Sequence, residues 1–139
     1  MFVRNIKEFK KKTNKKKIIC LDCGKKKVGI AISDENHKIS MPMETLVRNL
    51  EFYKNIIKII NDYNIGGILV GLPLGEEKKI NKMSQSIIDT TTNLDNHLNR
   101  SKLNIPFFFW DENYTSIEAE DSTYEFFKNK KKQKKFLDK

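Results

Sequence analysis

Residues 17–33 read KIICLDCGKKKVGIAIS, and this stretch decides the fold of the chain. Two short apolar runs, at 17–21 and 28–33, are separated by six residues that begin with Asp22 and include Gly24. Apolar runs joined by a short polar segment predict two antiparallel strands and a tight turn. Asp22 would then stand directly after the first strand, at its carboxyl end.

After this hairpin, the patterns of helices and strands alternate. A short apolar run broken by Pro42 predicts an edge strand. Apolar residues that recur three and four positions apart then predict two helices. Continuous apolar runs predict two buried strands. A capping box formed by Thr115 and Glu118 predicts a last helix that ends near Phe127. In order, the expected elements cover residues 39–47, 49–63, 68–71, 79–99, 106–110 and 115–127.

The resulting order, β-β-β-α-β-α-β-α, is typical of the α/β class. Three strands in sequence form an antiparallel meander, and the two later strands join the sheet in parallel with the first. We therefore expect one domain, built on a mixed five-stranded sheet that is flanked by helices.

Positive charge is concentrated at the two ends of the chain. Residues 1–17 carry eight basic and one acidic side chain, and residues 128–139 carry seven and one, so the body between them has a net charge of −4 in a chain of net charge +9. The basic ends suit a polyanionic partner, although solvated tails would have the same composition. We expect a flexible basic arm at 1–16, a domain at 17–127 and, at 128–139, a basic tail that starts a truncated final helix.

The cysteines and histidines do not form a metal-binding pattern. Cys20 and Cys23 are spaced as C-x-x-C, but they fall in a strand pattern, where residues three apart point to opposite faces. Without a second cysteine pair or a nearby histidine, both are expected to be buried, reduced thiols. His37 and His97 are expected at the surface.

No apolar stretch is long enough to span a membrane, and none resembles the core of a secretory signal. A cytoplasmic location is therefore expected. The basic, acid-poor segment 1–17 leaves open the alternative of an organelle, reached with removal of an N-terminal segment.

Acidic residues follow the strands that should be central in the sheet. In open α/β sheets, the functional site lies beyond the carboxyl ends of such strands. Three segments meet that description: Asp22-Cys23-Gly24, Gly71-Leu72-Pro73 and Asp111-Glu112. Acids beside buried strands are costly unless a partner compensates their charge, and divalent cations prefer carboxylate oxygens. The sequence therefore predicts a divalent-metal site at this edge.

Each of these residues also has a purely structural interpretation. Asp22 alone could be a turn residue that accepts backbone hydrogen bonds, and Glu112 could be a surface acid before a helix. Because Asp111 and Glu112 are adjacent, only one of them can face Asp22 from an extended strand. The lysines at 25–27 could attract a phosphate backbone or could simply be solvated in the first turn.

Four segments, in order along the chain, resemble the motifs of one family. They are DCGKKKVGIAISD (22–34), MPMETL (41–46), VGLPL (70–74) and WDENYTSIEAE (110–120). Over about residues 17–138, the chain resembles the YqgF-type Holliday junction resolvases, which are also described as pre-16S rRNA nucleases. The resemblance implies a ribonuclease-H-like fold and phosphodiester hydrolysis with Mg²⁺ or Mn²⁺.

The resemblance also implies roles for individual residues. Asp22 matches the acid of the first strand, Glu112 matches the acid after the last strand, and Asp138 matches the third acid of the family. These three would be catalytic, and together with Asp111 they would hold the metal. The residues expected to bind nucleic acid are Lys25, Lys26, Lys27, Thr115 and Ser116, and the expected site loops contain Gly24, Gly71 and Pro73.

The chain departs from the family pattern in several places. Lys25 stands where the family has Thr or Ser, and Asn113 stands where it has Arg, a cation that could hold phosphate. The segment 75–79 is short and charged. The sequence ends one residue after Asp138, so the family's final helix is expected to be truncated.

Two classes of function fit these observations. The first is a metal-dependent nuclease that acts on structured nucleic acid, either branched DNA or precursor 16S rRNA. The second is a non-catalytic nucleic-acid-binding or scaffolding domain of the same fold, which Asn113 and the truncated helix favour. An actin-like ATP-handling domain also has D-x-G after a first strand, but it needs a duplicated, much longer chain. A monomer or a weak homodimer is expected, with no membrane partner.

Overall fold

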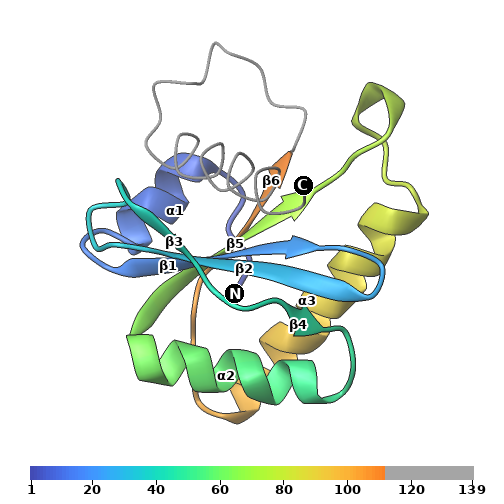
Figure 1. Ribbon diagram of the computed structural model, residues 1–139. Coiled ribbons are helices and arrows are strands. Elements are labelled where there is room, and N and C mark those ends of the chain that lie inside the picture. Colours follow the sequence, from blue (N-terminus) through green and yellow to red (C-terminus); the bar gives the residue numbers. More distant parts are fainter. Residues whose placement is uncertain (112–139) are drawn as a thin grey trace.

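The computed structural model describes residues 1–111, which form one mixed sheet with helices on both faces (Figure 1). The strands are β1 (Lys17–Cys23), β2 (Lys27–Ser33), β3 (Ser40–Pro42), β4 (Leu46–Val47), β5 (Ile65–Leu72) and β6 (Phe107–Asp111). The helices are α1 (Ile6–Lys12), α2 (Glu51–Tyr63) and α3 (Lys82–Arg100), with a 3-10 turn, η1, at Glu76–Lys78. None of these described helices has the length and apolar character needed to cross a membrane.

β1 lies inside the sheet because both of its edges are paired. On one side it is antiparallel to β2, with Ile19 opposite Ile32 and Asp22 opposite Gly29. On the other side it is parallel to β5, which is in turn parallel to β6. The strand order is β3-β2-β1-β5-β6. The predicted meander and the predicted parallel strands are therefore both confirmed.

The edge strand predicted at 39–47 is divided into two short strands. β3 and β4 both pair antiparallel with β2, and β4 lies off the main path of the sheet. Pro42 ends β3, because proline has no N–H to donate to the ladder. The described sheet therefore contains six strands where the sequence predicts five.

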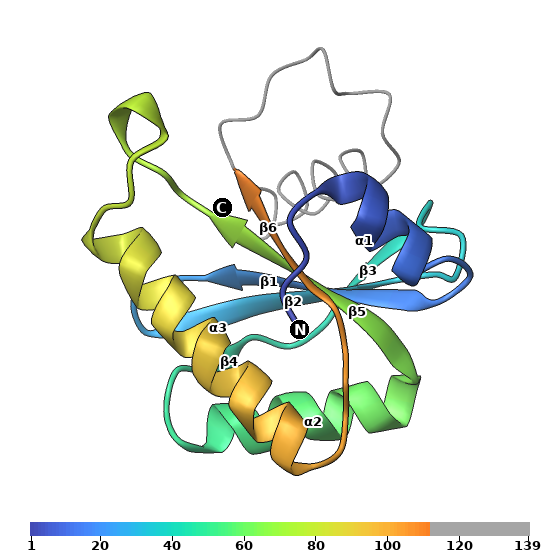
Figure 2. The ribbon, with the colours of Figure 1, turned by 180° about the vertical axis from the view of Figure 1, so that it is seen from behind.

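The two faces of β1 are buried in different apolar layers. Ile19 and Leu21 pack in the larger layer, beneath α2 and α3, which we call the α2/α3 face (Figure 2). Ile18 and Cys20 pack in the smaller layer, beneath α1, which we call the α1 face. Cys20 and Cys23 are buried and form no disulfide with each other, as predicted. Burial on both faces explains why β1 reads as a continuous apolar run.

The first residues pack on the sheet, whereas the charge pattern predicts a flexible arm at 1–16. The Asn5 side chain accepts a hydrogen bond from the Glu8 N–H and so caps α1. Phe9 of α1 is fully buried on the α1 face. Burying one phenylalanine side chain contributes about 1.5–3 kcal/mol to stability. This burial anchors a short helix that is otherwise rich in lysine.

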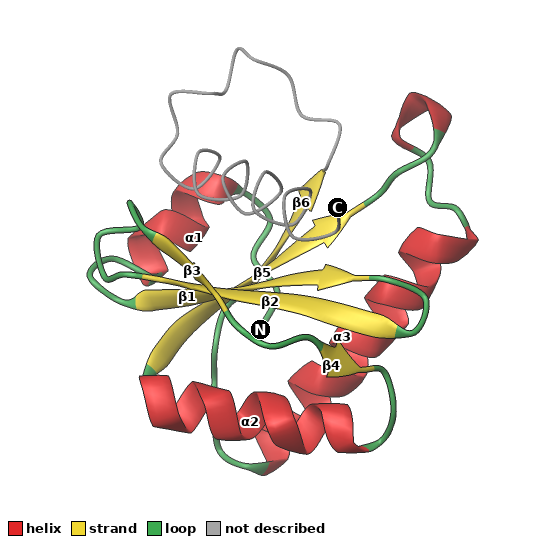
Figure 3. Ribbon diagram, viewed as in Figure 1, coloured by secondary structure: helices red, strands yellow, loops and turns green. Residues whose placement is uncertain are grey.

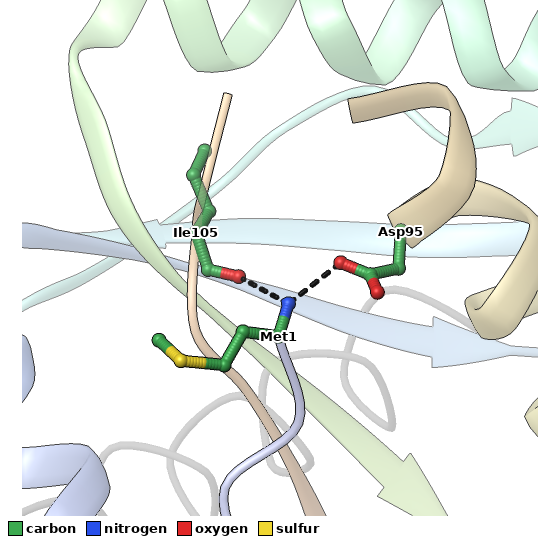
Figure 4. Close-up of polar contacts among 3 residues, drawn as sticks. All are labelled: Met1, Asp95 and Ile105. Carbon is green, nitrogen blue, oxygen red and sulfur yellow. Dashed lines mark hydrogen bonds and ion pairs between the residues drawn. The ribbon is translucent and has the colours of Figure 1, made fainter. Parts of the chain in front are cut away.

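The N-terminus covers the outer edge of β6. The Met1 ammonium nitrogen lies 2.6 Å from Asp95 Oδ1 in α3 and 3.2 Å from the Ile105 carbonyl oxygen (Figure 4). The Phe107 N–H donates to the Met1 carbonyl, and the Val3 N–H donates to the Phe107 carbonyl. This segment therefore pairs backbone groups that an edge strand would otherwise expose.

The two histidines differ in their surroundings. His37 is only 7% exposed, and its Nε2 lies 2.7 Å from the Lys16 carbonyl oxygen. His97 is half-buried, and its ring stacks on Tyr53 with 4.3 Å between the ring centroids. The predicted surface position is therefore wrong for His37, because its partner comes from a segment 21 residues away.

The stability of a Gly67 variant tests how closely α1 packs against β5. A Cβ at this position would lie 2.4 Å from Thr13 Cγ2 and 3.1 Å from Phe9 Cζ, and both of those residues are fully buried. We expect Gly67→Ala to lower the free energy of unfolding by about 1–3 kcal/mol, because overpacking forces such a site to shift. Urea unfolding followed by circular dichroism measures the change.

Gly75→Ala is the matched control. A Cβ at Gly75 would lie 3.4 Å from the Lys79 carbonyl oxygen, an ordinary contact distance, and neither glycine has a positive φ. Equal stability of the two variants would contradict the close docking of α1.

Candidate active site at the carboxyl ends of the parallel strands

The carboxyl ends of β1, β5 and β6 lie at the same edge of the sheet (Figure 3). Leu21 of β1 pairs with Val70 of β5, and β5 ends two residues later, at Leu72. Asp22, the residue after Leu21, therefore lies close to the carboxyl end of β5. Leu72, the last residue of β5, pairs with Asp111, the last residue of β6. The fold therefore brings together the three strand ends on which the predicted site depends.

Asp22 lies on the α1 face of the sheet. Side chains alternate along a strand, and its neighbours Leu21 and Cys23 both pack on the α2/α3 face. Asp22 is half-buried, and Gly29 is its partner across the hairpin. A Cβ at Gly29 would lie 3.8 Å from Asp22 Cβ. Because glycine has no side chain, residue 29 places no side-chain atoms beside Asp22.

Asp111 lies at the same edge but on the other face. Trp110 packs on the α1 face, and Phe109 packs against the α2/α3 face, so alternation assigns Asp111 to the α2/α3 face. Of the predicted acids, Asp111 therefore does not share a face with Asp22. The predicted site residues Glu112, Thr115, Ser116 and Asp138 lie outside the described residues.

The described part of the site offers carboxylate oxygens from β1 and β6, the ligands that hard divalent cations prefer. Within residues 1–111, no group of three or more His, Cys, Asp or Glu side chains is placed to hold a metal ion. A metal held by three or more side chains at this edge would therefore need further donors from the residues after Asp111.

Three exposed lysines follow β1, with Lys25 and Lys26 in the turn and Lys27 as the first residue of β2; we call this group the lysine turn. The Gly24 N–H donates to the Lys27 carbonyl oxygen at 2.7 Å and so closes the turn. A Cβ at Gly24 would lie only 3.1 Å from that oxygen, which favours glycine there. The closed turn holds three positive charges within a few residues of Asp22.

Gly71 and Pro73 lie where the chain leaves β5. Gly71 pairs with Trp110, and the Pro73 carbonyl accepts a 3.4 Å hydrogen bond from Asn81 Nδ2. Asn81 also caps α3 through reciprocal hydrogen bonds with Ser84. These bonds hold the two ends of a loop that extends outward from the site edge (Figure 1).

Arg48 connects the lysine turn to α3, and no motif in the sequence points to this role. Its Nη1 donates to the Gly24 carbonyl at 2.7 Å, and its Nη2 donates to Ser86 Oγ at 2.9 Å and to Thr90 Oγ1 at 2.7 Å. Its backbone N–H also donates to the Lys26 carbonyl at 2.8 Å. One guanidinium therefore fixes the turn that follows Asp22.

Composition contains a weak signal for this role. Only three of the 27 basic residues are arginines, at positions 4, 48 and 100. A planar guanidinium with five donors can bridge several acceptors at once, which the compact lysine ammonium does less well. The acceptors in α3 are 38 and 42 residues away, so the sequence does not identify them.

Arg48→Lys should lower the free energy of unfolding by about 2 kcal/mol. Hydrogen bonds from charged donors contribute about 1.5–3 kcal/mol, and lysine cannot reach all three acceptors together. Urea unfolding measures the loss, and amide hydrogen exchange at Gly24 should become faster. Arg100→Lys is the control, because Arg100 is exposed and makes one 3.4 Å bond to the Asn96 carbonyl. Two equally stable variants would refute the bridging role.

Known proteins are similar in sequence to this chain along most of its length. A family model described as "RuvX: Holliday junction resolvase" matches residues 16–139. A relative from Pelagibacter ubique is 34% identical over 117 residues, which cover 82% of this chain and 74% of the relative. One from Mycoplasma mobile is 36% identical over 123 residues, covering 86% and 81%. Both are named "Putative pre-16S rRNA nuclease".

Among solved structures, T. thermophilus RuvC in complex with a Holliday junction substrate is similar, with a TM-score of 0.50. The likeness covers 70% of this chain and 65% of that chain at 6% identity, so it concerns the fold alone. It confirms the ribonuclease-H-like arrangement that the motifs imply. Because the family model matches nearly the whole sequence, the chain belongs to the RuvX family of Holliday junction resolvases, the YqgF-type family that its motifs resemble.

Proposed function

We propose that this chain is a nuclease that hydrolyses phosphodiester bonds in structured nucleic acid with divalent metal ions. The position of Asp22 supports this most directly, since its carboxylate is half-buried at the carboxyl end of a strand inside the sheet. Membership of a resolvase family, and relatives that are named as pre-16S rRNA nucleases, support the same activity.

Mg²⁺ or Mn²⁺ is the proposed cofactor, held by Asp22, Glu112 and Asp138. Carboxylates at neighbouring strand ends suit these ions, because both prefer oxygen ligands. When bound, paired divalent ions activate water and stabilise the leaving oxygen. Asp22 contributes a negative charge whose position is set by strand pairing on both sides of β1.

Of the two adjacent acids Asp111 and Glu112, we propose Glu112 as the partner of Asp22, because alternation along β6 places Asp111 on the opposite face. Trp110 shares the α1 face with Asp22, whereas Asp111 belongs to the α2/α3 face. Asp111 is thus turned away from Asp22, and the family motif supplies Glu112 as the other candidate. Asp111 should then matter less for catalysis than Glu112.

The lysine turn is proposed to bind phosphates beside the scissile bond, and Thr115 and Ser116 are proposed to add hydrogen bonds. Contacts of this kind position a nucleic acid without reading its sequence. Precursor 16S rRNA is the proposed substrate because the relatives are named for it, and branched DNA is the alternative that the family description suggests. We propose that the chain acts as a monomer or a weak homodimer.

A second candidate is a nucleic-acid-binding scaffold without catalysis. Asn113 favours it, because the matching family residue is an arginine that could hold phosphate. The two functions agree on binding and differ only in cleavage, so one assay separates them.

Asp22→Asn should slow single-turnover cleavage of a precursor rRNA fragment or a branched DNA by about 100-fold or more, because an amide cannot supply the carboxylate charge that the metal requires. Glu112→Gln should have a similar effect, and Asp111→Asn a smaller one. The assay is run in Mg²⁺ and again in Mn²⁺, with binding of each substrate measured in parallel.

Asp62→Asn is the matched control, since Asp62 is exposed on α2 and the charge change is the same. Its cleavage rate should equal that of the wild type. Binding of both substrates without cleavage in either metal would establish the scaffold function instead. Equal cleavage by the Asp22 and Asp62 variants would remove Asp22 from the site.

A further inference from the structure

α1 presents lysines on the side that faces away from the sheet. Ile6, Phe9 and Thr13 recur at helical spacing, and Phe9 and Thr13 are fully buried. Lys7 and Lys11 are exposed, and residues four apart lie on one face of a helix. The helix therefore has an apolar stripe against the sheet and a basic stripe toward solvent.

The basic surface continues into the turn that connects α1 to β1. We call the whole group the α1 lysines, and each of its members is exposed: Lys7, Lys11, Lys12, Lys15 and Lys16. Residues 1–17 contain a single acid, Glu8. None of the α1 lysines forms an ion pair with another described residue. The group is therefore a concentrated patch of positive charge.

Docking of the helix holds this patch in place. A Cβ at Gly67 would lie 2.4 Å from Thr13 Cγ2, and one at Gly66 would lie 2.5 Å from Lys16 Cδ. These two glycines let α1 and its turn approach the start of β5 closely. Thr13 Oγ1 also donates to the Phe9 carbonyl at 2.8 Å, in the buried layer. The lysines thus belong to a defined surface.

The α1 lysines lie on the same face of the sheet as Asp22. Ile18 and Cys20 of β1 pack beneath α1, and Asp22 is the next residue on that face. The four residue-to-residue steps from Ile18 to Asp22 span about 13 Å of strand. Phosphates of one nucleic-acid strand repeat about every 3.4 Å along a duplex axis. A duplex at Asp22 would therefore come level with α1 within roughly four phosphates.

Along β1, Asp22 lies between α1 and the lysine turn. The body between the two basic ends of the chain has a net charge of −4, since residues 1–17 contribute +7 and residues 128–139 contribute +6 to the total of +9. A negative body repels a polyanion unless local positive charge offsets it. Two basic surfaces on either side of the acidic site would provide that offset.

We propose that the α1 lysines form a second phosphate-binding surface for the nucleic acid whose scissile bond lies at Asp22. The inference rests on the proposed function for the position of the substrate. Lysines near a helix C-terminus also complement the helix dipole, which explains Lys11 and Lys12 but neither Lys7, in the first turn, nor Lys15, beyond the helix. The phosphate backbone of a duplex accounts for all of them.

The test compares the binding of a duplex DNA by the wild type and by the triple variant Lys7→Gln, Lys11→Gln, Lys15→Gln. Chelator is present throughout, so cleavage plays no part in the result. Each lost phosphate contact should reduce the slope of log K against log salt by about 0.9. The triple variant should lose about 2–3 from that slope and bind about 100-fold more weakly at 0.1 M salt.

The matched control is Lys54→Gln, Lys58→Gln, Lys102→Gln. Lys54 and Lys58 are exposed and four apart on α2, which covers the opposite face, and Lys102 is an exposed loop lysine with φ of 60°, close to the 59° of Lys15. Both triples remove three charges. The control should keep the wild-type slope.

Equal losses in the two triples, or no loss in the α1 triple, would overturn the proposed surface. Because binding is measured without metal, a chain that binds through α1 but never cleaves would disprove the nuclease activity and leave this surface standing. A chain that cleaves, but binds duplex DNA equally well without the three α1 lysines, would disprove this surface and leave the nuclease activity standing.

Discussion

The parallel pairing of β1 with β5, between two apolar layers, is the constraint on which the rest of the structure depends. It places β1 inside the sheet, and the parallel direction carries Asp22 to the edge where β5 and β6 also end. Alternation along β1 then separates the residues that build the α2/α3 face from Asp22 on the α1 face. The candidate site is thus a consequence of strand direction and side-chain period.

Local patterns were sufficient to predict the elements that carry this constraint. β1 and β5 are continuous apolar runs because both of their faces are covered, and such runs are easily recognised as strands in a sequence. The run predicts a strand that ends before Asp22, whereas β1 continues to Cys23, so Asp22 is the last residue but one of the strand. The buried state of Cys20 and Cys23 follows from the same run. Family motifs then selected, from several acids, those with a catalytic interpretation.

Features that depend on contacts between distant segments could not be read in this way. The lysine content of residues 1–16 suggests a solvated arm, yet Phe9 docks on β5 because two glycines, Gly66 and Gly67, leave room for α1 and its turn. Arg48 has acceptors in a helix about 40 residues away, and His37 bonds to a carbonyl of the N-terminal segment. In each case the partner is set by the tertiary fold. The same fold puts the α1 lysines and Asp22 on one face.

The most direct test of the central claim is the location of bound metal. Crystals soaked in MnCl₂ and measured at the manganese absorption edge would show the ion by its anomalous scattering. We expect manganese within about 2.5 Å of an Asp22 carboxylate oxygen, on the α1 face of the sheet at the carboxyl end of β1. Manganese bound elsewhere, with none at Asp22, would contradict it.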